Sequence, residues 1–267
     1  MFLNKKSLTK IRLLAGTYLV LSASCFLIAI LFSAWQIEYK SHIFLGCLCL
    51  VLMPIFYKIG YYSEGKGKLI AKGNQLICHE LRPAEFIRLY EEKRDDPTNS
   101  ITKPDFDVLR QLLTAYDALG DTDSALKIID QMIQIAPDKK IHEAKLLKAS
   151  LLFSVGNHNE EAETIYRDVV SGQLNILTKA LADAVMKCDR ALALGDDATA
   201  EIFLKQSLTQ KFSKPTPLSR LSAHYHLARI CYRANRMEEA EEHRQYCIEN
   251  GGDTSMQSDA VEGEIFQ

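Results

Sequence analysis

Residues 104–137 decide the fold of this 267-residue chain, and they read PDFDVLRQLLTAYDALGDTDSALKIIDQMIQIAP. In the first half, apolar side chains recur at three- and four-residue spacings from Leu109 to Tyr116, which places them on one face of a helix. Gly120 and the polar residues around it interrupt this pattern, and a second apolar face follows. Pro137 ends that face, because proline cannot continue a helix. The segment therefore predicts two helices joined by a tight turn.

The same pattern returns three times along the chain. Each later copy has an apolar helix, a turn residue and a small residue near the start of its second helix. The turn residues lie 36, 39 and 40 positions apart and are Gly120, Gly156, Gly195 and Asn235. The small residues that follow them are Ala125, Ala162, Ala200 and Ala240. Because helices that pack about 8–10 Å apart need small side chains at the crossing, the copies predict four packed helix pairs.

The first copy resembles the tetratricopeptide repeat (TPR). The residues at the family's spacings are Leu112, Tyr116, Ala125, Ile129 and Pro137, whereas Leu109 and Leu113 replace the usual Trp and Gly. The repeats are also longer than the family's period of about 34 residues. The resemblance covers residues 104–250. It implies an all-α chain with a TPR-like right-handed α-solenoid of about four helix pairs, whose concave surface binds a protein or peptide partner.

Two apolar segments precede the repeats. Residues 13–35 carry no charged side chain, and at about 1.5 Å per residue they exceed the roughly 30 Å hydrocarbon core of a membrane. Residues 43–62 form a second and shorter candidate span, in which Lys58 can extend its ammonium group to the membrane surface. Because the loop at 36–42 is short, residues 1–62 are predicted to form a two-helix membrane anchor.

Basic residues flank these two segments on the same side. Lysine and arginine precede the first and follow the second, whereas Lys40 is the only basic residue between them. The positive-inside rule therefore predicts a multi-pass protein of the cell membrane, with both termini and the repeats in the cytoplasm. A cleaved signal peptide fits less well, because its apolar part is normally about 7–15 residues long. A single span followed by a surface-lying segment is the other alternative.

Charge divides the chain into a basic and an acidic part. Residues 1–72 carry a net charge of +7 and the remainder −9. Phosphate binding needs clustered Lys and Arg, so the acidic repeats argue against nucleic-acid binding. Residues 63–103 are interpreted as a basic linker and a preceding helix. Residues 251–267 contain no Lys or Arg and no apolar period, and they are expected to form an acidic flexible tail.

Partial motifs for phosphate and zinc chemistry are incomplete. The segment Gly60 to Gly67 nearly forms a phosphate-binding loop, but Gly67 stands where the motif needs Ser or Thr. His142 begins a zinc-protease pattern, but Leu146 occupies the position of its second histidine. We therefore predict no catalytic residues, no cofactor and no enzyme activity.

Histidines and cysteines gather in the last repeat, at His224, His226, Cys231, His243 and Cys247. Structural zinc sites usually show tight paired spacings in both halves, and this set lacks them. The prediction is accordingly no metal site. An enzyme or metal protein that uses this set remains an alternative.

The resemblance also supplies candidate contact residues, because TPR proteins bind partners along the first helices of their repeats. These candidates are Arg110, Asp117, Phe153, Tyr225, Arg229, Tyr232 and Arg233. Tyr225, Arg229 and the neighbouring Tyr232 and Arg233 share one face of the first helix of the last repeat. Tyr and Arg are enriched among the residues that contribute most to protein binding. The alternative interpretation is that these arginines pair with acidic residues of the array itself.

Together these features predict a membrane-tethered adaptor that binds a protein partner non-covalently. A tether would raise the effective concentration of the repeats for partners at the membrane. The alternative function is a structural subunit of a membrane complex, assembled through the hairpin. Small residues such as Gly46 and Cys47 would allow close helix approach there.

Overall fold

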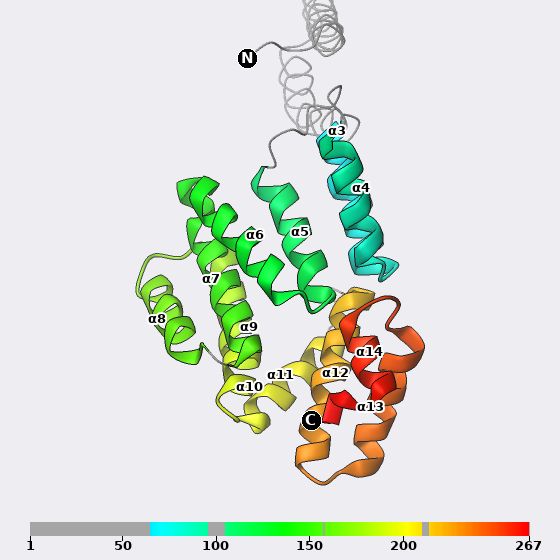
Figure 1. Cartoon of the computed structure of the whole chain (residues 1–267). Coiled ribbons are helices and arrows are strands. Elements are labelled where there is room, and N and C mark those ends of the chain that lie inside the picture. The colour runs from blue at the N-terminus through cyan, green and yellow to red at the C-terminus, as the bar shows by residue number, and fades with distance from the viewer. Residues whose placement is uncertain (1–64, 96–104, 157, 210–213, 267) are drawn as a thin grey trace, which may run out of the picture. The chain divides into compact units, whose positions relative to one another are not determined.

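The computed structural model describes residues 65–95, 105–156, 158–209 and 214–266, and these contain helices and no strand (Figure 1). The chain divides into two compact units, 1–67 and 68–267, and nearly all described residues belong to the second. The predicted spans 13–35 and 43–62 lie outside the described residues. Within the described part, every helix is too short or too polar to cross a membrane.

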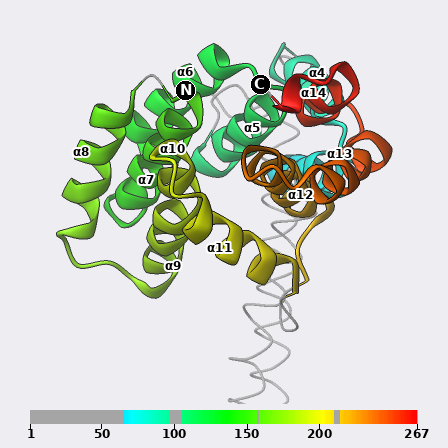
Figure 2. The ribbon, with the colours of Figure 1, turned by 90° about the horizontal axis from the view of Figure 1, so that it is seen from below.

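Four helix pairs follow one another along the second unit, as the sequence predicts. They are α5 (Phe106–Ala118) with α6 (Thr122–Ile135), α7 (Asp138–Val155) with α8 (Asn159–Val170), α9 (Ile176–Val185) with α11 (Asp197–Thr209), and α12 (Pro217–Arg233) with α13 (Met237–Asn250). In the third pair, α9 continues through a π-helical turn, η2 (Met186–Arg190), into the short α10 (Ala191–Ala193). Each pair packs against the next, so the order in space follows the order in the chain (Figures 1 and 2).

The four predicted turn residues adopt one backbone conformation. Gly120, Gly156, Gly195 and Asn235 have φ angles of +72°, +76°, +74° and +59°. This left-handed region is open to glycine and tolerated by asparagine, which explains the residue types at these positions. In three of the turns the next amide donates to the carbonyl five residues earlier. These bonds are Asp121 to Tyr116 at 3.0 Å, Asp196 to Ala191 at 2.8 Å and Arg236 to Cys231 at 2.8 Å.

Small side chains lie where the two helices of each pair meet. The four predicted alanines are at most 1% exposed, as expected for small residues at a helix crossing; they are Ala125, Ala162, Ala200 and Ala240. The recurring turn and the recurring buried alanine are consistent with a helical repeat.

Residues 65–95 form a further helix pair. Residues 83–95 are the helix expected before the repeats, whereas residues 65–79, expected to be linker, are helical as well. Helix α3 (Gly65–Asn74) runs directly into a π-helical turn, η1 (Gln75–His79), and α4 (Pro83–Asp95) follows. Leu69, Leu76 and Phe86 are fully buried. Lys66, Lys68 and Lys72 give this segment a linker-like charge, but the spacing of its buried leucines is that of a packed helix.

The acidic C-terminal segment is helical and packed, so the expectation of a flexible tail is wrong for residues 253–266. Helix α14 (Ser255–Glu262) and the 3-10 turn η3 (Glu264–Phe266) follow α13. Ala260 and Ile265 are fully buried in a cluster with residues of α12 and α13. The Arg244 guanidinium also donates to the Ala260 carbonyl at 2.7 Å. A few apolar residues in an acidic sequence are enough to bind this segment to its neighbours.

The last helices contact the first ones, and no spacing within the repeats predicts this contact. The Asp253 amide donates to the Leu81 carbonyl at 3.0 Å, and the Ser255 hydroxyl donates to the Ala118 carbonyl at 3.4 Å. Gly252 lies so close to Leu81 that a Cβ atom would be 2.3 Å from that carbonyl oxygen. Helix α12 also packs against η1.

Candidate functional site

One of the seven candidate contact residues is part of the core. Phe153, on α7, is 2% exposed and packs in a cluster that includes Ala182 and Val185 of α9. The TPR pattern places this position on an exposed first-helix face, but the third pair covers it. Phe153 is therefore a packing residue, and its ring is not accessible to a partner.

The two tyrosines of α12 contact the C-terminal segment. The Tyr225 hydroxyl donates to Asp259 Oδ2 at 2.7 Å. Burial, followed by this hydrogen bond, raises the pKa of Tyr225. The Tyr232 ring stacks on Phe266 with 4.6 Å between centroids and 13° between planes. Both rings therefore help to hold residues 255–266 in place, and Tyr232 remains 38% exposed.

Two of the candidate arginines pair with acids of the array, as the alternative interpretation anticipates. Arg233 binds both carboxylate oxygens of Asp197, at 2.8 Å and 2.5 Å. Arg110 lies 3.0 Å from the Glu143 carboxylate. These contacts join neighbouring helix pairs, so neither guanidinium is free for a partner without breaking an internal bond.

Arg229 and Asp117 are different, because no oppositely charged group among the described residues pairs with either. The Arg229 guanidinium carbon lies 6.0 Å from the centroid of the Tyr225 ring. Burial, and next the charges of Arg229 and Arg233, lower the pKa of His226 to about 4. Asp117 is exposed, yet the surrounding helices desolvate its carboxylate and raise its pKa.

Arg229 belongs to a set of equivalent positions, six residues before each turn residue. We call this set the inner row; its members are Thr114, Ser150, Asp189 and Arg229. The Ser150 hydroxyl donates to Asp189 Oδ2, so members of the second and third pairs meet directly. Burial, opposed in part by this bond, raises the pKa of Asp189 to about 6. The first helices thus present polar and charged groups at corresponding positions.

The histidine and cysteine set is only partly brought together. Donor atoms of Cys231, Glu239 and His243 all lie within 4.8 Å of one another. His224 Nδ1 is 3.0 Å from His243 Nδ1. The other two members are separate from this group: His226 packs against Tyr225, and the Cys247 thiol lies 3.9 Å from the Leu221 carbonyl.

The set predicted from the sequence contains only histidine and cysteine, so it leaves out Glu239. The available signal was spacing: Glu239 and His243 are four residues apart and share a helix face. Burial also raises the pKa of the thiols of Cys78, Cys188, Cys231 and Cys247. Protonated thiols are poor nucleophiles, so the described cysteines lack the environment of a catalytic cysteine.

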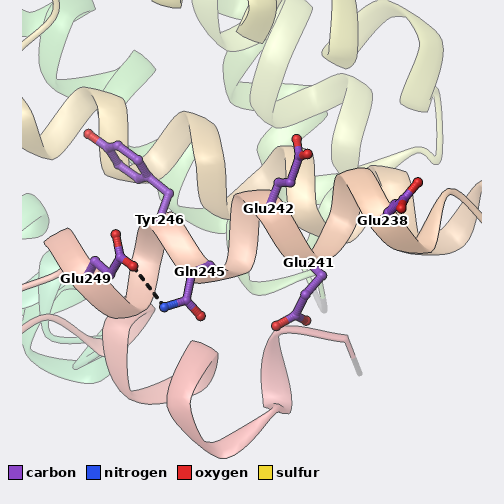
Figure 3. A pocket seen from close by; sticks show the side chains of 6 residues that line it. All are labelled: Glu238, Glu241, Glu242, Gln245, Tyr246 and Glu249. Carbon is purple, nitrogen blue, oxygen red and sulfur yellow. Dashed lines mark hydrogen bonds between the residues drawn. The ribbon is translucent and has the colours of Figure 1, made fainter.

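A shallow acidic depression runs along α13 (Figure 3). Its lining residues are Glu238, Glu241, Glu242, Gln245, Tyr246 and Glu249. The Gln245 amide donates to Glu249 at 3.0 Å, and the Tyr246 ring stacks on His224 with 3.8 Å between centroids. The lining contains four glutamates and no basic side chain, so the depression is negatively charged.

Comparison of the chain with protein-family models, curated proteins and solved structures finds no match.

Proposed function

We propose that this protein is a membrane-tethered adaptor of the TPR type, which binds a protein partner non-covalently along the first helices of its repeats. The supporting features of the sequence are the two apolar segments at 13–35 and 43–62 and the TPR-like spacing of the repeats. The supporting features of the structure are the successive helix pairs and the polar inner row.

The observation that carries this proposal is the state of Arg229. Its guanidinium is half-buried and lies near the face of Tyr225, yet no carboxylate among the described residues neutralises it. Other arginines of the array, such as Arg190 and Arg236, bind glutamates at 2.6–2.9 Å. An arginine that is oriented but unpaired can form a two-bond contact with a carboxylate of a partner. We therefore propose that the partner presents an acidic side chain or a terminal carboxylate to Arg229.

The test is crosslinking of the full-length chain in membranes, followed by purification in mild detergent and identification of captured proteins. Arg229→Ala is compared with Arg220→Ala, which removes an exposed arginine from the same helix. We expect the natural chain and Arg220→Ala to capture the same partner. Arg229→Ala should reduce its recovery by about tenfold, the size expected for a hot-spot arginine.

A third chain separates the two functional classes. In this chain residues 1–62 are replaced by an unrelated two-span anchor. An adaptor should keep its partner after this exchange, because the contact lies in the repeats. A partner that is retained by Arg229→Ala but lost on the exchange would contradict the adaptor and identify a membrane subunit assembled through its hairpin.

A further inference from the structure

Three side chains with metal-ligand chemistry converge between α12 and α13. Cys231 comes from the C-terminal turn of α12, whereas Glu239 and His243 lie one helical turn apart on α13. Their donor atoms are all within 4.8 Å of one another. In tetrahedral zinc sites, bonds of about 2.0–2.3 Å place donor atoms roughly 3.5 Å apart. Small side-chain rotations would therefore bring all three donors onto one ion.

An unpartnered nitrogen marks the same place. His243 Nε2 is buried and has no hydrogen-bond partner. The other ring nitrogen, Nδ1, lies 3.0 Å from His224 Nδ1. When His243 Nδ1 carries the proton and donates it to His224, the Nε2 lone pair is free. This is the tautomer that a metal-binding histidine needs, and such ligands are normally oriented by a bond of this kind.

The partner of that bond is itself held in place. His224 stacks on the Tyr246 ring with 14° between planes, so its ring cannot turn away without losing this contact. Cys231 is fully buried. Two of the four groups that build the site are thus fixed by packing before any ion arrives.

We propose that Cys231, Glu239 and His243 bind a divalent transition-metal ion, for which Zn²⁺ has the best chemical fit. One sulfur, one carboxylate oxygen and one imidazole nitrogen are all donors that zinc accepts. Binding breaks the S–H bond of Cys231 and forms a metal–sulfur bond, and the proton passes to water. Three protein ligands leave one coordination position for water. This proposal goes beyond the adaptor function and does not depend on it.

The neighbouring charges hold the carboxylate in position. Lys205 lies 3.0 Å from Glu239 Oε1, and Arg236 lies 2.7 Å from Oε2. Glu201 binds both of these cations at 2.7 Å. Each carboxylate oxygen has two lone pairs, so Glu239 can bind an ion and keep these contacts. The thiolate formed at Cys231 offsets part of the charge that the ion adds.

Co²⁺ is the probe for the test, since it replaces zinc and absorbs light when bound to thiolate. The untagged full-length chain in detergent is stripped with a chelator and titrated with Co²⁺. We expect one equivalent to bind, with a sulfur-to-cobalt charge-transfer band in the near ultraviolet that Zn²⁺ abolishes by displacement. Isothermal calorimetry in two buffers should detect the released proton.

Two variants and one control locate the site. Cys231→Ser should lose the charge-transfer band, whereas Cys188→Ser, the same change on another first helix, should keep it. His243→Ile should weaken Co²⁺ binding by more than the roughly 10- to 100-fold that loss of a ligand's hydrogen-bond partner costs, because the ligand itself is lost. Circular dichroism before titration checks that each variant is helical. A natural chain without the band, or a band that survives Cys231→Ser, would overturn the proposal.

Discussion

The first and last of the four helix pairs, α5–α6 and α12–α13, share a turn but differ in their interiors. When Gly120 is aligned with Asn235, four side chains of the first pair correspond to four of the last. The correspondences are Leu109 with His224, Tyr116 with Cys231, Ser124 with Glu239, and Ile128 with His243. The first pair thus has three packing residues and a serine where the last has the proposed metal donors and the histidine that orients them. The hairpin does not need these polar residues in order to form.

The two pairs also begin their second helices differently. The Asp121 carboxylate accepts a hydrogen bond from the Ser124 amide at 3.1 Å and so caps α6. The corresponding residue before α13 is Arg236, whose side chain makes no such bond and instead binds Glu201 and Glu239. Both pairs bury apolar side chains, but the second helix of the first pair begins with a capping carboxylate and that of the last pair with a salt-bridged arginine.

The largest expected effect comes from the apolar interior of the first pair. Ile129 is fully buried, and Ile129→Ala should lower the free energy of unfolding by about 2–5 kcal/mol, because a cavity remains. The corresponding residue of the last pair is Arg244, which is part-exposed and donates to the Ala260 carbonyl. Arg244→Ala should cost less, about 1.5 kcal/mol, the lower end of the range for a hydrogen bond that involves a charged group. Urea unfolding followed by circular dichroism measures both.

Equal losses for Ile129→Ala and Arg244→Ala would break this comparison. They would mean that the polar contacts of α13 contribute as much as the apolar core of α6. The slope of the unfolding free energy against urea must be unchanged, so that the midpoints report stability alone.

Exchanging the corresponding residues His243 and Ile128 tests whether the proposed metal donors lower the stability of the last pair. His243→Ile introduces the residue found at the same place in α6. It removes the buried Nε2, which has no partner, together with the Nδ1 contact to His224, so the two changes in stability oppose each other. In chelator-treated protein we expect the unfolding free energy to stay within about 1 kcal/mol of the natural value or to rise. Ile128→His, the opposite exchange, should lower it by about 1–3 kcal/mol, because an apolar contact is replaced by a polar ring.

Thermal unfolding with added Zn²⁺ tests the same two chains for metal binding. The natural chain should gain thermal stability as Zn²⁺ is added, whereas His243→Ile should not, since an ion that binds only the folded state stabilises it. A strong loss of stability for His243→Ile without metal would contradict the view that this position is reserved for binding.

The smallest effect is expected at the helix cap. Asp121→Ala should cost about 1 kcal/mol, the usual value of an N-cap. Asp123→Ala, in the first turn of the same helix, is the control and should cost less than about 0.5 kcal/mol. The bond to Ser124 lowers the pKa of Asp121 below its ordinary value, so its contribution is complete above the unfolded pKa of about 4. It should be lost as the pH falls through the lower folded pKa, which urea unfolding at several pH values would detect.

The parts of the fold that depend on neighbours in sequence could be predicted, and those that depend on distant neighbours could not. The turns at Gly120 and Asn235 follow from local backbone conformation, and the buried alanines follow from helix contact. The packing of residues 253–266 depends on Leu81 and Arg244, which lie far away or on another helix. No spacing within an acidic segment reveals such partners.

The candidate site shows the same division. Phe153 occupies a first-helix position in the repeat pattern, but its exposure depends on how closely the third pair approaches. The pairing of Arg233 with Asp197 was anticipated only as an alternative, because sequence alone does not show which acid lies opposite which arginine. Glu239 joins Cys231 and His243 only after the turn has brought α12 and α13 together.

The contact between Leu81 and Asp253 also limits how this array can change in evolution. Open repeat proteins gain and lose units by duplication and deletion, since each unit touches only its neighbours. In this chain an inserted helix pair would move the C-terminal helices away from α3 and α4 and break the bonds at both Leu81 and Ala118. The number of repeats is therefore coupled to the contact between the ends. Variation among descendants of this sequence should appear as substitutions within repeats rather than as changes in repeat number.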